Sequence, residues 1–324
     1  MGNRPRVRKA IWIAWENQVR NRSMARLLSS NLYVLNRSGN RPNRYAYCVF
    51  WSLMAILRER PDVVFVQNPS LILNYLMLAL RPIFRFRWVS DAHFAGVVAN
   101  NGSSLMQALI DCCNRRADLV IVTNENHADH VKSLGGRPYV CEDPLPELPE
   151  DVLDLDEDMD RSIFLICSFE VDEPYLQVFS AAGILQEEGC KLYVSGNYRN
   201  VSIKPDDYPH VTFLGYVPYD RYVSYLTQSS VVVDLTTCED LLLCGAYEAM
   251  AAGRPLVTSN TEALRTYFSH GVIYTNEEPA NIAAAIRMAY EDRVRLCAEI
   301  SAWKAMAVPE NARKISTLRS LCDE

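Results

Sequence analysis

The chain has 324 residues, of which 49% are hydrophobic and 22% are charged, and its net charge at pH 7 is −6. This length and composition predict a globular protein of two domains, and the acidic balance argues against a general nucleic-acid-binding protein. Ten cysteines without a C-x-x-C pair, accompanied by only five histidines, indicate neither a zinc site nor a dense disulfide framework. The apolar run near the amino terminus is too short for a signal peptide, and no segment reaches membrane-spanning length. We therefore expect a cytoplasmic protein with reduced thiols.

Short apolar segments alternate with segments of helical length through the first half of the chain. The predicted strands cover residues 10–14, 31–35, 63–66, 87–90, 119–122 and 139–141. This alternation predicts a doubly wound α/β domain. No G-x-G-x-x-G motif follows the first strand, so a hydride-transfer enzyme is disfavoured.

The loop after the first predicted strand is polar and basic. It leads into a helix that carries Arg20 and Arg22. Guanidinium groups bind phosphates well, so either arginine is a candidate for the phosphate of a donor or for an anionic acceptor. The alternative is that both are solvated helix residues.

Two apolar helices are predicted at residues 44–58 and 70–80. The second is followed by a basic edge formed by Arg81, Arg85 and Arg87. This pattern fits a helix resting on a membrane surface. Burial inside the domain explains the same pattern and is the interpretation that we favour.

Asp91 and His93 follow the fourth predicted strand. Ligands of open parallel sheets bind off the carboxyl ends of the strands, so both residues are candidates for a site. A lone histidine is more often structural, but the position of this one favours a functional role, with Asp91 orienting it or holding the loop.

A stiff proline-rich linker at residues 144–149 and an acidic run at 150–160 separate the halves of the chain. The second half alternates again, with predicted strands at residues 163–167, 191–194, 211–214, 230–235, 256–259 and 272–274. We expect one Rossmann-like domain at residues 1–149 and another at 150–308.

The segment from Val231 to Pro255 combines a strand, a polar loop and a helix. Glu248, on the helix, suits a ribose diol, while Asp240 or Glu239 suits a sugar ring, because a carboxylate accepts two hydroxyl hydrogens. Backbone N–H groups at the helix start suit a diphosphate. These groups belong to Leu243, Cys244, Gly245 and Ala246. Diol, diphosphate and sugar together describe a nucleotide sugar.

This segment resembles the signature of the retaining GT-B glycosyltransferases of family 4. The residues that carry the resemblance are Asp240, Glu248, Ala249, Met250, Ala251, Gly253 and Pro255. The resemblance implies two Rossmann-like domains facing across a cleft and transfer of a sugar to an acceptor hydroxyl with retention. It also implies that His93 contacts the donor sugar and that the last helix, residues 309–324, packs back on the first domain. No metal is expected, since no Asp-x-Asp stands at a strand end, and no cofactor is expected besides the donor.

The chain departs from the family in the loop of the signature segment, where residues 241–244 replace the family's usual Gly-Phe-Gly or similar small residues. The more serious departure concerns the cations of the second domain. The family has an arginine and a lysine after the first strand of the second domain, where they hold the diphosphate. Residues 168–174 contain neither, so the candidate replacements are Arg199 or an arginine of the first domain. Tyr216 and Val217 stand where the family holds the nucleobase.

The expected partners are a nucleotide sugar and a glycan, lipid-linked or small-molecule acceptor, with no nucleic acid and a possible peripheral contact at the inner membrane face. A role in polysaccharide or glycoconjugate synthesis fits this chemistry. Two rival functions stay open. One is a non-hydrolysing nucleotide-sugar epimerase, and the other is a catalytically silent GT-B protein that binds a nucleotide sugar or a partner enzyme.

Overall fold

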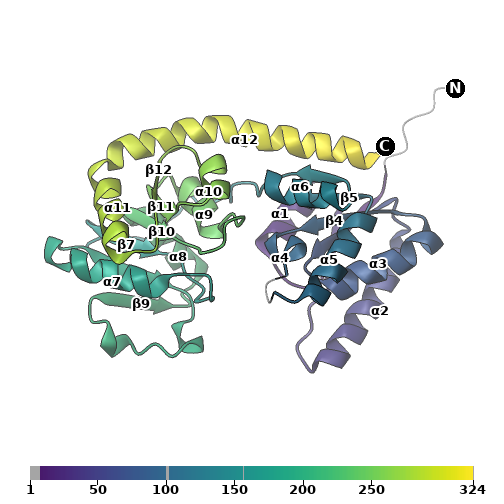
Figure 1. Ribbon diagram of the computed structural model, residues 1–324, viewed down its shortest axis with the longest axis horizontal. Helices are drawn as coiled ribbons and strands as arrows, with labels where there is room; N and C mark the ends of the chain where they lie inside the picture. Colours follow the sequence, from purple (N-terminus) through teal and green to yellow (C-terminus); the bar gives the residue numbers. More distant parts are fainter. Residues whose placement is uncertain (1–7, 100–101, 156, 324) are drawn as a thin grey trace. The chain divides into compact units, whose positions relative to one another are not determined.

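The structure is a computed structural model that describes residues 8–99, 102–155 and 157–323. It divides into two compact units (Figure 1). Unit 1 comprises the described residues up to Pro144 and from Glu310 onward, and unit 2 comprises Leu145–Pro309. The chain thus enters unit 2 five residues before the expected boundary, because Leu145 and Leu148 pack against the core of unit 2.

Unit 1 contains a six-stranded parallel sheet in the order β2-β1-β3-β4-β5-β6. Crossover helices cover both faces of such a sheet, which explains why its strands are nearly continuous hydrophobic runs. The strands are β1 (Ala10–Ala14), β2 (Asn31–Val34), β3 (Val63–Asn68), β4 (Arg87–Ala92), β5 (Leu119–Val122) and β6 (Pro138–Val140).

The helices of unit 1 connect successive strands. They are α1 (Val19–Leu27), α2 (Arg41–Glu59), α3 (Leu71–Phe84), α4 (Phe94–Val97), α5 (Ser104–Arg116) and α6 (Glu125–Ser133). Local signals define their ends. At the start of α2 the side chain of Asn40 accepts a hydrogen bond from the N–H of Asn43, and Pro42 lies in the first turn. The helix ends where Arg60 adopts a left-handed conformation with a φ of 44°.

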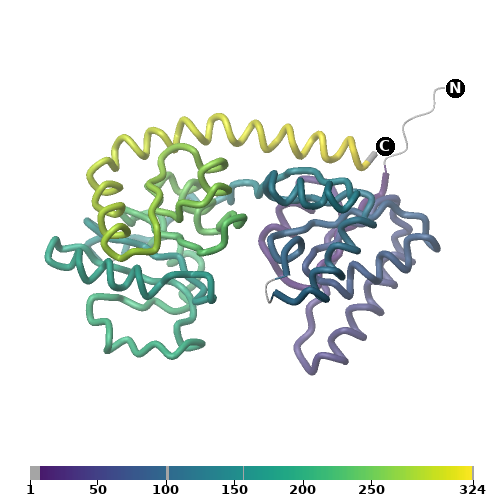
Figure 2. The backbone as a smooth tube through the Cα atoms, in the orientation of Figure 1, coloured from purple at the N-terminus to yellow at the C-terminus, as the bar shows by residue number. Residues whose placement is uncertain are grey.

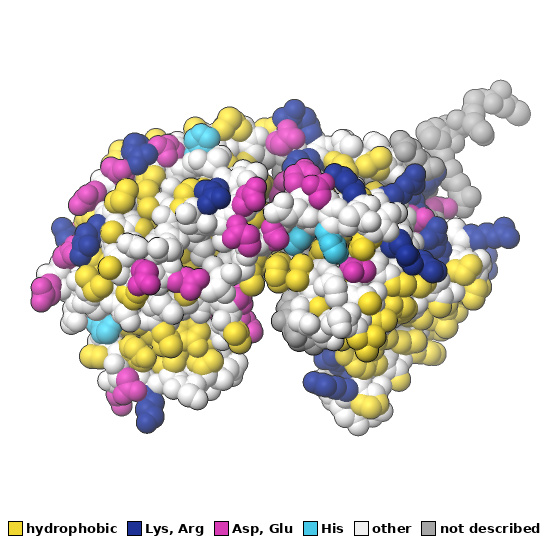
Figure 3. Space-filling view, in the orientation of Figure 1, with side chains coloured by type: hydrophobic (Ala, Val, Ile, Leu, Met, Phe, Trp, Pro, Cys, Tyr) yellow, Lys and Arg dark blue, Asp and Glu magenta, His cyan; other side chains and the backbone are white. Residues whose placement is uncertain are grey.

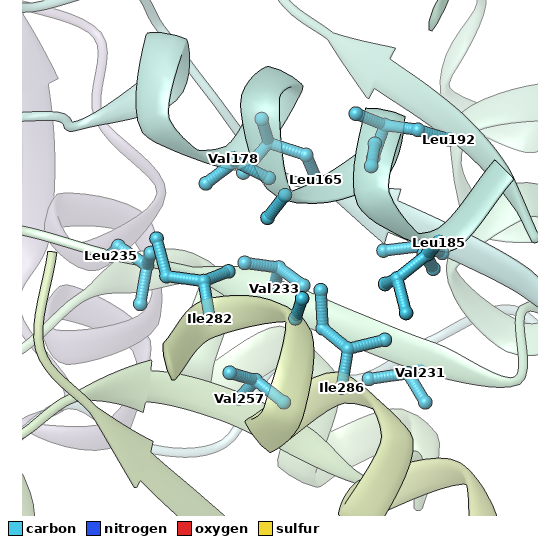
Figure 4. Packing of buried hydrophobic residues seen from close by; sticks show 14 of the residues in the cluster. Leu165, Val178, Leu185, Leu192, Val231, Val233, Leu235, Val257, Ile282 and Ile286 are labelled. Atoms are coloured by element: carbon cyan, nitrogen blue, oxygen red, sulfur yellow. The ribbon is translucent and has the colours of Figure 1, made fainter. Parts of the chain in front are cut away.

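Unit 2 repeats the same architecture with the strand order β12-β11-β10-β7-β8-β9. Its strands are β7 (Ser162–Leu165), β8 (Lys191–Ser195), β9 (Val211–Gly215), β10 (Val231–Asp234), β11 (Leu256–Ser259) and β12 (Val272–Thr275). Figure 4 shows the core on one face, where Val231 and Val233 of the central strand pack against Val178 and Ile282 of the flanking helices. All twelve predicted strands are confirmed, each within two residues of its predicted bounds.

The helices of unit 2 are α7 (Tyr175–Leu185), α8 (Tyr219–Gln228), α9 (Cys244–Ala252), α10 (Glu262–Tyr267) and α11 (Pro279–Glu291), and α12 (Arg293–Asp323) begins in this unit. α12 is one helix that contains Pro309 (Figure 2), whereas the sequence suggested a separate helix from that residue on. Its part beyond Pro309 belongs to unit 1, where Lys314 forms an ion pair with Glu142 at 2.6 Å. Among the described helices, none combines the length and the hydropathy that a membrane span requires.

Candidate functional site

The loop between β10 and α9 holds the acidic groups of the candidate donor site. Asp234 is the last residue of β10, and its side chain is buried at the start of α9. Its carboxyl group accepts hydrogen bonds from the backbone N–H groups of Gly245 and Ala246. Burial raises the pKa of Asp234 well above its ordinary value, and the charges of Glu173 and Glu248 add to this, whereas the two N–H groups oppose it. Burial thus favours the protonated form of this carboxyl group more than it does for an exposed aspartate.

This arrangement bears on the predicted diphosphate position. Four N–H groups were expected to face the diphosphate, and two of them, from Gly245 and Ala246, are directed at Asp234. The start of α9 thus already holds an acid from its own unit. The predicted role of Leu243, which is buried, and of Cys244, which is exposed, stays a prediction.

Glu248 lies one turn further along α9 and is half-buried. Its Oε2 atom accepts a hydrogen bond from the hydroxyl of Tyr222 on α8. Burial raises the pKa of Glu248, and the hydrogen bond from Tyr222 acts in the opposite direction. The tyrosine fixes the orientation of the carboxylate that the sequence assigned to a ribose diol.

Glu239 and Asp240 were the two candidates for the sugar ring. The Oε1 atom of Glu239 accepts a hydrogen bond of 2.6 Å from the backbone N–H of Glu262, the first residue of α10. Glu239 therefore caps a neighbouring helix. Asp240 is half-buried in the same loop.

The loop after β7 is where the resemblance places two cations, and it is organised by acids instead. The carboxylate of Glu173 accepts hydrogen bonds from the N–H groups of Ser168 and Glu170, at 3.0 and 2.9 Å. Asp172 joins this loop to the one after β10, since its Oδ2 accepts from the hydroxyl of Thr236 at 2.8 Å. The two loops therefore form one connected unit at the carboxyl edge of the sheet.

The remaining donor-site candidates of unit 2 follow β8 and β9. Arg199 is exposed on a short 3-10 helix, Tyr198–Asn200, with its guanidinium carbon 5.8 Å from the ring of Tyr198. Tyr216 is 85% exposed and Val217 is half-buried directly after β9, the edge strand. All three follow the carboxyl ends of their strands, and the helix of Glu248 begins at the same side of the sheet.

In unit 1 the residues singled out at the ends of β1 and β4 meet in one buried ion pair. The guanidinium of Arg20 donates from Nη2 to Oδ1 of Asp91 at 2.7 Å and from Nε to Oδ2 at 3.0 Å. A further Arg20 nitrogen, Nη1, contacts Asp143. Burial alone would raise the pKa of Asp91, but the interactions with Arg20 and His93 hold it well below its usual range. Arg20, a candidate for phosphate binding, is thus buried and shared between two carboxylates.

His93 and Arg22 differ from Arg20 in exposure. The Nε2 atom of His93 lies 3.3 Å from Oδ2 of Asp91, and 26% of its side chain is exposed. This places Asp91 where it can orient the imidazole. Arg22 is exposed on α1.

A residue that the sequence patterns did not single out lies beside this pair. Gln67 is the register partner of Asp91 on the neighbouring strand β3, so the two side chains project from the same face of the sheet. It is only 1% exposed, and neither atom of its amide has a hydrogen-bond partner among the described residues. A buried amide without partners is unusual and marks a polar position next to Asp91 and His93.

Residues 163–292 match the family model described as glycosyl transferases group 1. The matched region runs from β7 to the end of α11 and includes Glu248 and its helix. Most of unit 2 thus matches a group 1 glycosyltransferase domain. The expected enzyme class is confirmed at this level. No curated protein matches the sequence.

Solved structures show the same fold across the chain. Anabaena HepE, solved in complex with UDP-glucose, is 15% identical with a TM-score of 0.70, and the match covers 97% of this chain and 100% of that chain. Sucrose-phosphate synthase from Thermosynechococcus elongatus is 16% identical with a TM-score of 0.69, covering 97% and 96%. UDP-GlcNAc 2-epimerase from Methanocaldococcus jannaschii is 15% identical with a TM-score of 0.57, covering 88% and 93%. These matches confirm the predicted GT-B fold.

The glycosyltransferase domain contains three residues near Glu248 that the sequence patterns did not reveal as site residues: Asp234, Tyr222 and Glu173. A signal existed for Asp234, because an acid that ends the apolar run Val231–Asp234 stands at the carboxyl end of a strand. No local pattern connects Tyr222 or Glu173 with Glu248. Within the described ranges, no group of three or more histidine, cysteine or acidic side chains has a geometry that could hold a metal ion.

Proposed function

We propose that the protein transfers a sugar from a nucleotide-sugar donor to an acceptor hydroxyl, with retention of the anomeric configuration and without a metal ion. The observation that carries the proposal is the position of Glu248 in the group 1 glycosyltransferase domain, half-buried on α9 and held by Tyr222. A carboxylate fixed in this way can accept both hydrogens of a ribose diol.

The charges around Glu248 give Asp234 a part in this proposal. A diphosphate bound near the start of α9 would meet Glu173, Glu248 and Asp234, and three carboxylates would repel it. The raised pKa of Asp234 favours its neutral form, which lowers the negative charge that the diphosphate would meet. Arg199 is the cation of unit 2 that we assign to the diphosphate.

In unit 1 we assign His93 to the donor sugar, oriented by Asp91 and indirectly by Arg20. Stabilisation of the developing positive charge at the sugar and of the departing diphosphate is the main electrostatic task of such an enzyme. The complex of HepE with UDP-glucose makes a uridine nucleotide the first donor to try. We further propose that the enzyme works in the cytoplasm on glycan or lipid-linked acceptors, in polysaccharide or glycoconjugate synthesis, with unit 1 in contact with the membrane.

The test is thermal stabilisation by UDP, GDP and their sugars, measured on the natural protein, on Glu248→Gln and on a control, Glu277→Gln. Glu277 is an exposed glutamate of the same unit. A ligand at about a hundred times its dissociation constant adds ~2.7 kcal/mol to stability. We expect the natural protein and the control to respond to one nucleotide and Glu248→Gln to lose most of that response. An equal response of Glu248→Gln would refute the assignment of this residue.

A non-hydrolysing epimerase is the second candidate function, and the fold shared with the M. jannaschii UDP-GlcNAc 2-epimerase is the observation that favours it. Product analysis by NMR separates the two reactions. A transferase releases nucleoside diphosphate only when an acceptor is supplied and forms a glycoside with the donor's anomeric configuration. An epimerase converts the nucleotide sugar without an acceptor. A protein that binds a nucleotide sugar without converting it, or that no nucleotide stabilises, would be the catalytically silent GT-B protein.

A further inference from the structure

The arginines of the chain are unevenly distributed. Residues 17–90 contain eleven arginines and only two acidic residues, Glu59 and Asp62, although the whole chain has a net charge of −6. One of the two acids is already neutralised, because Glu59 forms an ion pair of 2.6 Å with Lys9. Two of the eleven arginines are paired with acids outside the stretch, Arg20 with Asp91 and Arg81 with Asp118. The stretch, which includes α2 and α3, still has an excess of positive charge in an acidic protein.

The same two helices expose large apolar side chains. We call this the α2–α3 surface, and it consists of Phe50, Trp51 and Leu57 on α2 and Ile72 and Ile83 on α3, each between 42% and 69% exposed. The two helices pack beside each other in unit 1. Figure 3 shows hydrophobic side chains gathered over them. Exposed apolar patches of this kind mark protein or membrane interaction sites.

Arginines lie at the ends of the two helices that form the α2–α3 surface. Arg58 and Arg60 stand at the end of α2, and Arg85 stands at the end of α3. Arg37 and Arg44 near the start of α2 lie over the rings of Tyr47 and Tyr45, each at 5.1 Å. Tyrosine and tryptophan rings beside arginines are the combination found at the boundary between lipid headgroups and acyl chains.

Two arginines of unit 2, Arg287 and Arg295, are placed differently. On its surface Arg287 pairs with Glu188, and Arg295 pairs with both Asp292 and Glu299. Their charges are compensated locally by carboxylates. The cationic character of the α2–α3 surface is therefore a feature of unit 1 and does not reflect a general excess of arginine.

We propose that the α2–α3 surface docks unit 1 on an anionic lipid bilayer, with Phe50, Trp51 and Ile83 entering the interface and the arginines contacting lipid phosphates. Both observations are needed for this choice of partner. A nucleic acid would satisfy the arginines but leave the aliphatic side chains in water, and a neutral bilayer would cover the aliphatic side chains but not attract the arginines. The inference deepens the membrane contact that the proposed function assigns to unit 1 and rests on that part of it. It is tested separately from the sugar transfer, because lipid binding requires neither donor nor turnover.

The chain carries its own fluorescent reporter for this contact. Trp51 is 45% exposed, whereas the other four tryptophans are at most 7% exposed. They are Trp12, Trp15, Trp88 and Trp303. A change of tryptophan emission when vesicles are added therefore reports on the environment of Trp51.

The experiment compares vesicles of phosphatidylcholine alone with vesicles that also contain phosphatidylglycerol, using flotation and tryptophan emission. We expect the protein to bind the anionic vesicles, with a blue shift of Trp51, and to bind the neutral vesicles at least tenfold less. Phe50→Ser/Ile83→Ser and Arg58→Glu/Arg85→Glu should each lose at least tenfold in binding to anionic vesicles, because both groups contribute.

The control variant is Val171→Ser/Val294→Ser, which changes two exposed apolar residues of unit 2, 102% and 84% exposed, and should bind like the natural protein. All substituted side chains are exposed, so unchanged melting temperatures show that each variant is folded. Equal binding to both kinds of vesicle, or unchanged binding by either surface variant, would overturn the proposal. A dimer that these variants dissociate, without vesicle binding by the natural protein, would assign the surface to a second copy of the chain. Nucleotide binding is measured separately, so a failure of the proposed function is distinguishable from a failure of this one.

Discussion

Asp91 of unit 1 and Asp234 of unit 2 occupy similar places in their sheets, and burial of the two carboxyl groups is compensated in opposite ways. Each lies at the carboxyl end of a strand within a parallel sheet, and each is buried. Asp91 keeps its charge because the guanidinium of Arg20 meets both of its oxygens, so its pKa is lowered. Asp234 has Glu173 and Glu248 as its charged neighbours, and its pKa is raised.

The comparison concerns the charge at the carboxyl ends of the two sheets, where we propose that ligands bind. Burying a lone charge is costly, so a buried carboxyl group is either paired or neutral. In unit 1 the pairing gives a fixed anion that lies 3.3 Å from His93 and can orient it. In unit 2 neutralisation leaves less negative charge at the start of α9, where an anionic donor group is expected.

The largest effect is expected from Arg20→Met, which leaves Asp91 buried without its cation. Removing one partner of a buried ion pair typically costs about 3–5 kcal/mol. Urea unfolding followed by tryptophan emission measures this, because four of the five tryptophans belong to unit 1 and only Trp303 belongs to unit 2.

Two further variants make this prediction specific. Arg22→Met, two residues away on the same helix but exposed, should change stability by no more than about 0.5 kcal/mol. Arg20→Met/Asp91→Leu removes both charges and should be more stable than Arg20→Met alone. A loss below about 1 kcal/mol for Arg20→Met would show that the pair does not stabilise unit 1.

The contrast between the two aspartates also shows what could be predicted from sequence. The twelve strands are visible because they are largely apolar runs and most of them are followed by an α-helical segment. Glu248 is visible because the motif around it is local. The partners of the aspartates are not local. Arg20 and Asp91 are 71 residues apart, and Glu173 and Asp234 are 61 residues apart. Periodicity predicts which residues are buried but not which two loops meet. The sequence therefore suggested Arg20 as a phosphate-binding or solvated cation, and Asp234 only as part of a strand.

A second, smaller effect is expected from Gly245→Ala at the start of α9. A Cβ atom there would contact Oδ2 of Asp234 and lie 2.8 Å from Cγ2 of Ile166. Alanine favours a helix by about 1 kcal/mol over glycine, but overpacking of this kind costs about 1–3 kcal/mol. We expect a net loss, or at most no gain, in the urea midpoint followed by circular dichroism.

Gly183→Ala on α7 is the matched control. Its Cβ would meet the ring of His210 at 3.5 Å, an ordinary contact distance. This variant should gain about 0.5–1 kcal/mol from helix propensity. If Gly245→Ala gained as much, Asp234 would not be packed against the start of α9.

The smallest effect at neutral pH is expected from Asp234→Asn, and its sign is the informative part. A carboxyl group whose pKa is raised by folding contributes its full stability below its unfolded pKa, near 4, and this contribution is lost as pH rises towards the folded value. Asparagine does not titrate and its amide oxygen can still accept from the N–H groups of Gly245 and Ala246. Asp234→Asn should therefore become more stable relative to the natural protein as pH rises above about 4.

Asp91→Asn should behave in the opposite way, because the lowered pKa of Asp91 contributes stability above its unfolded pKa and loses it only as pH falls through the folded value. Calorimetric melting of both variants between about pH 2 and pH 8 tests the comparison directly, because the Asp91→Asn difference should change below about pH 4 and the Asp234→Asn difference above it. Two difference curves that change over the same pH range in the same direction would contradict the contrast between the units.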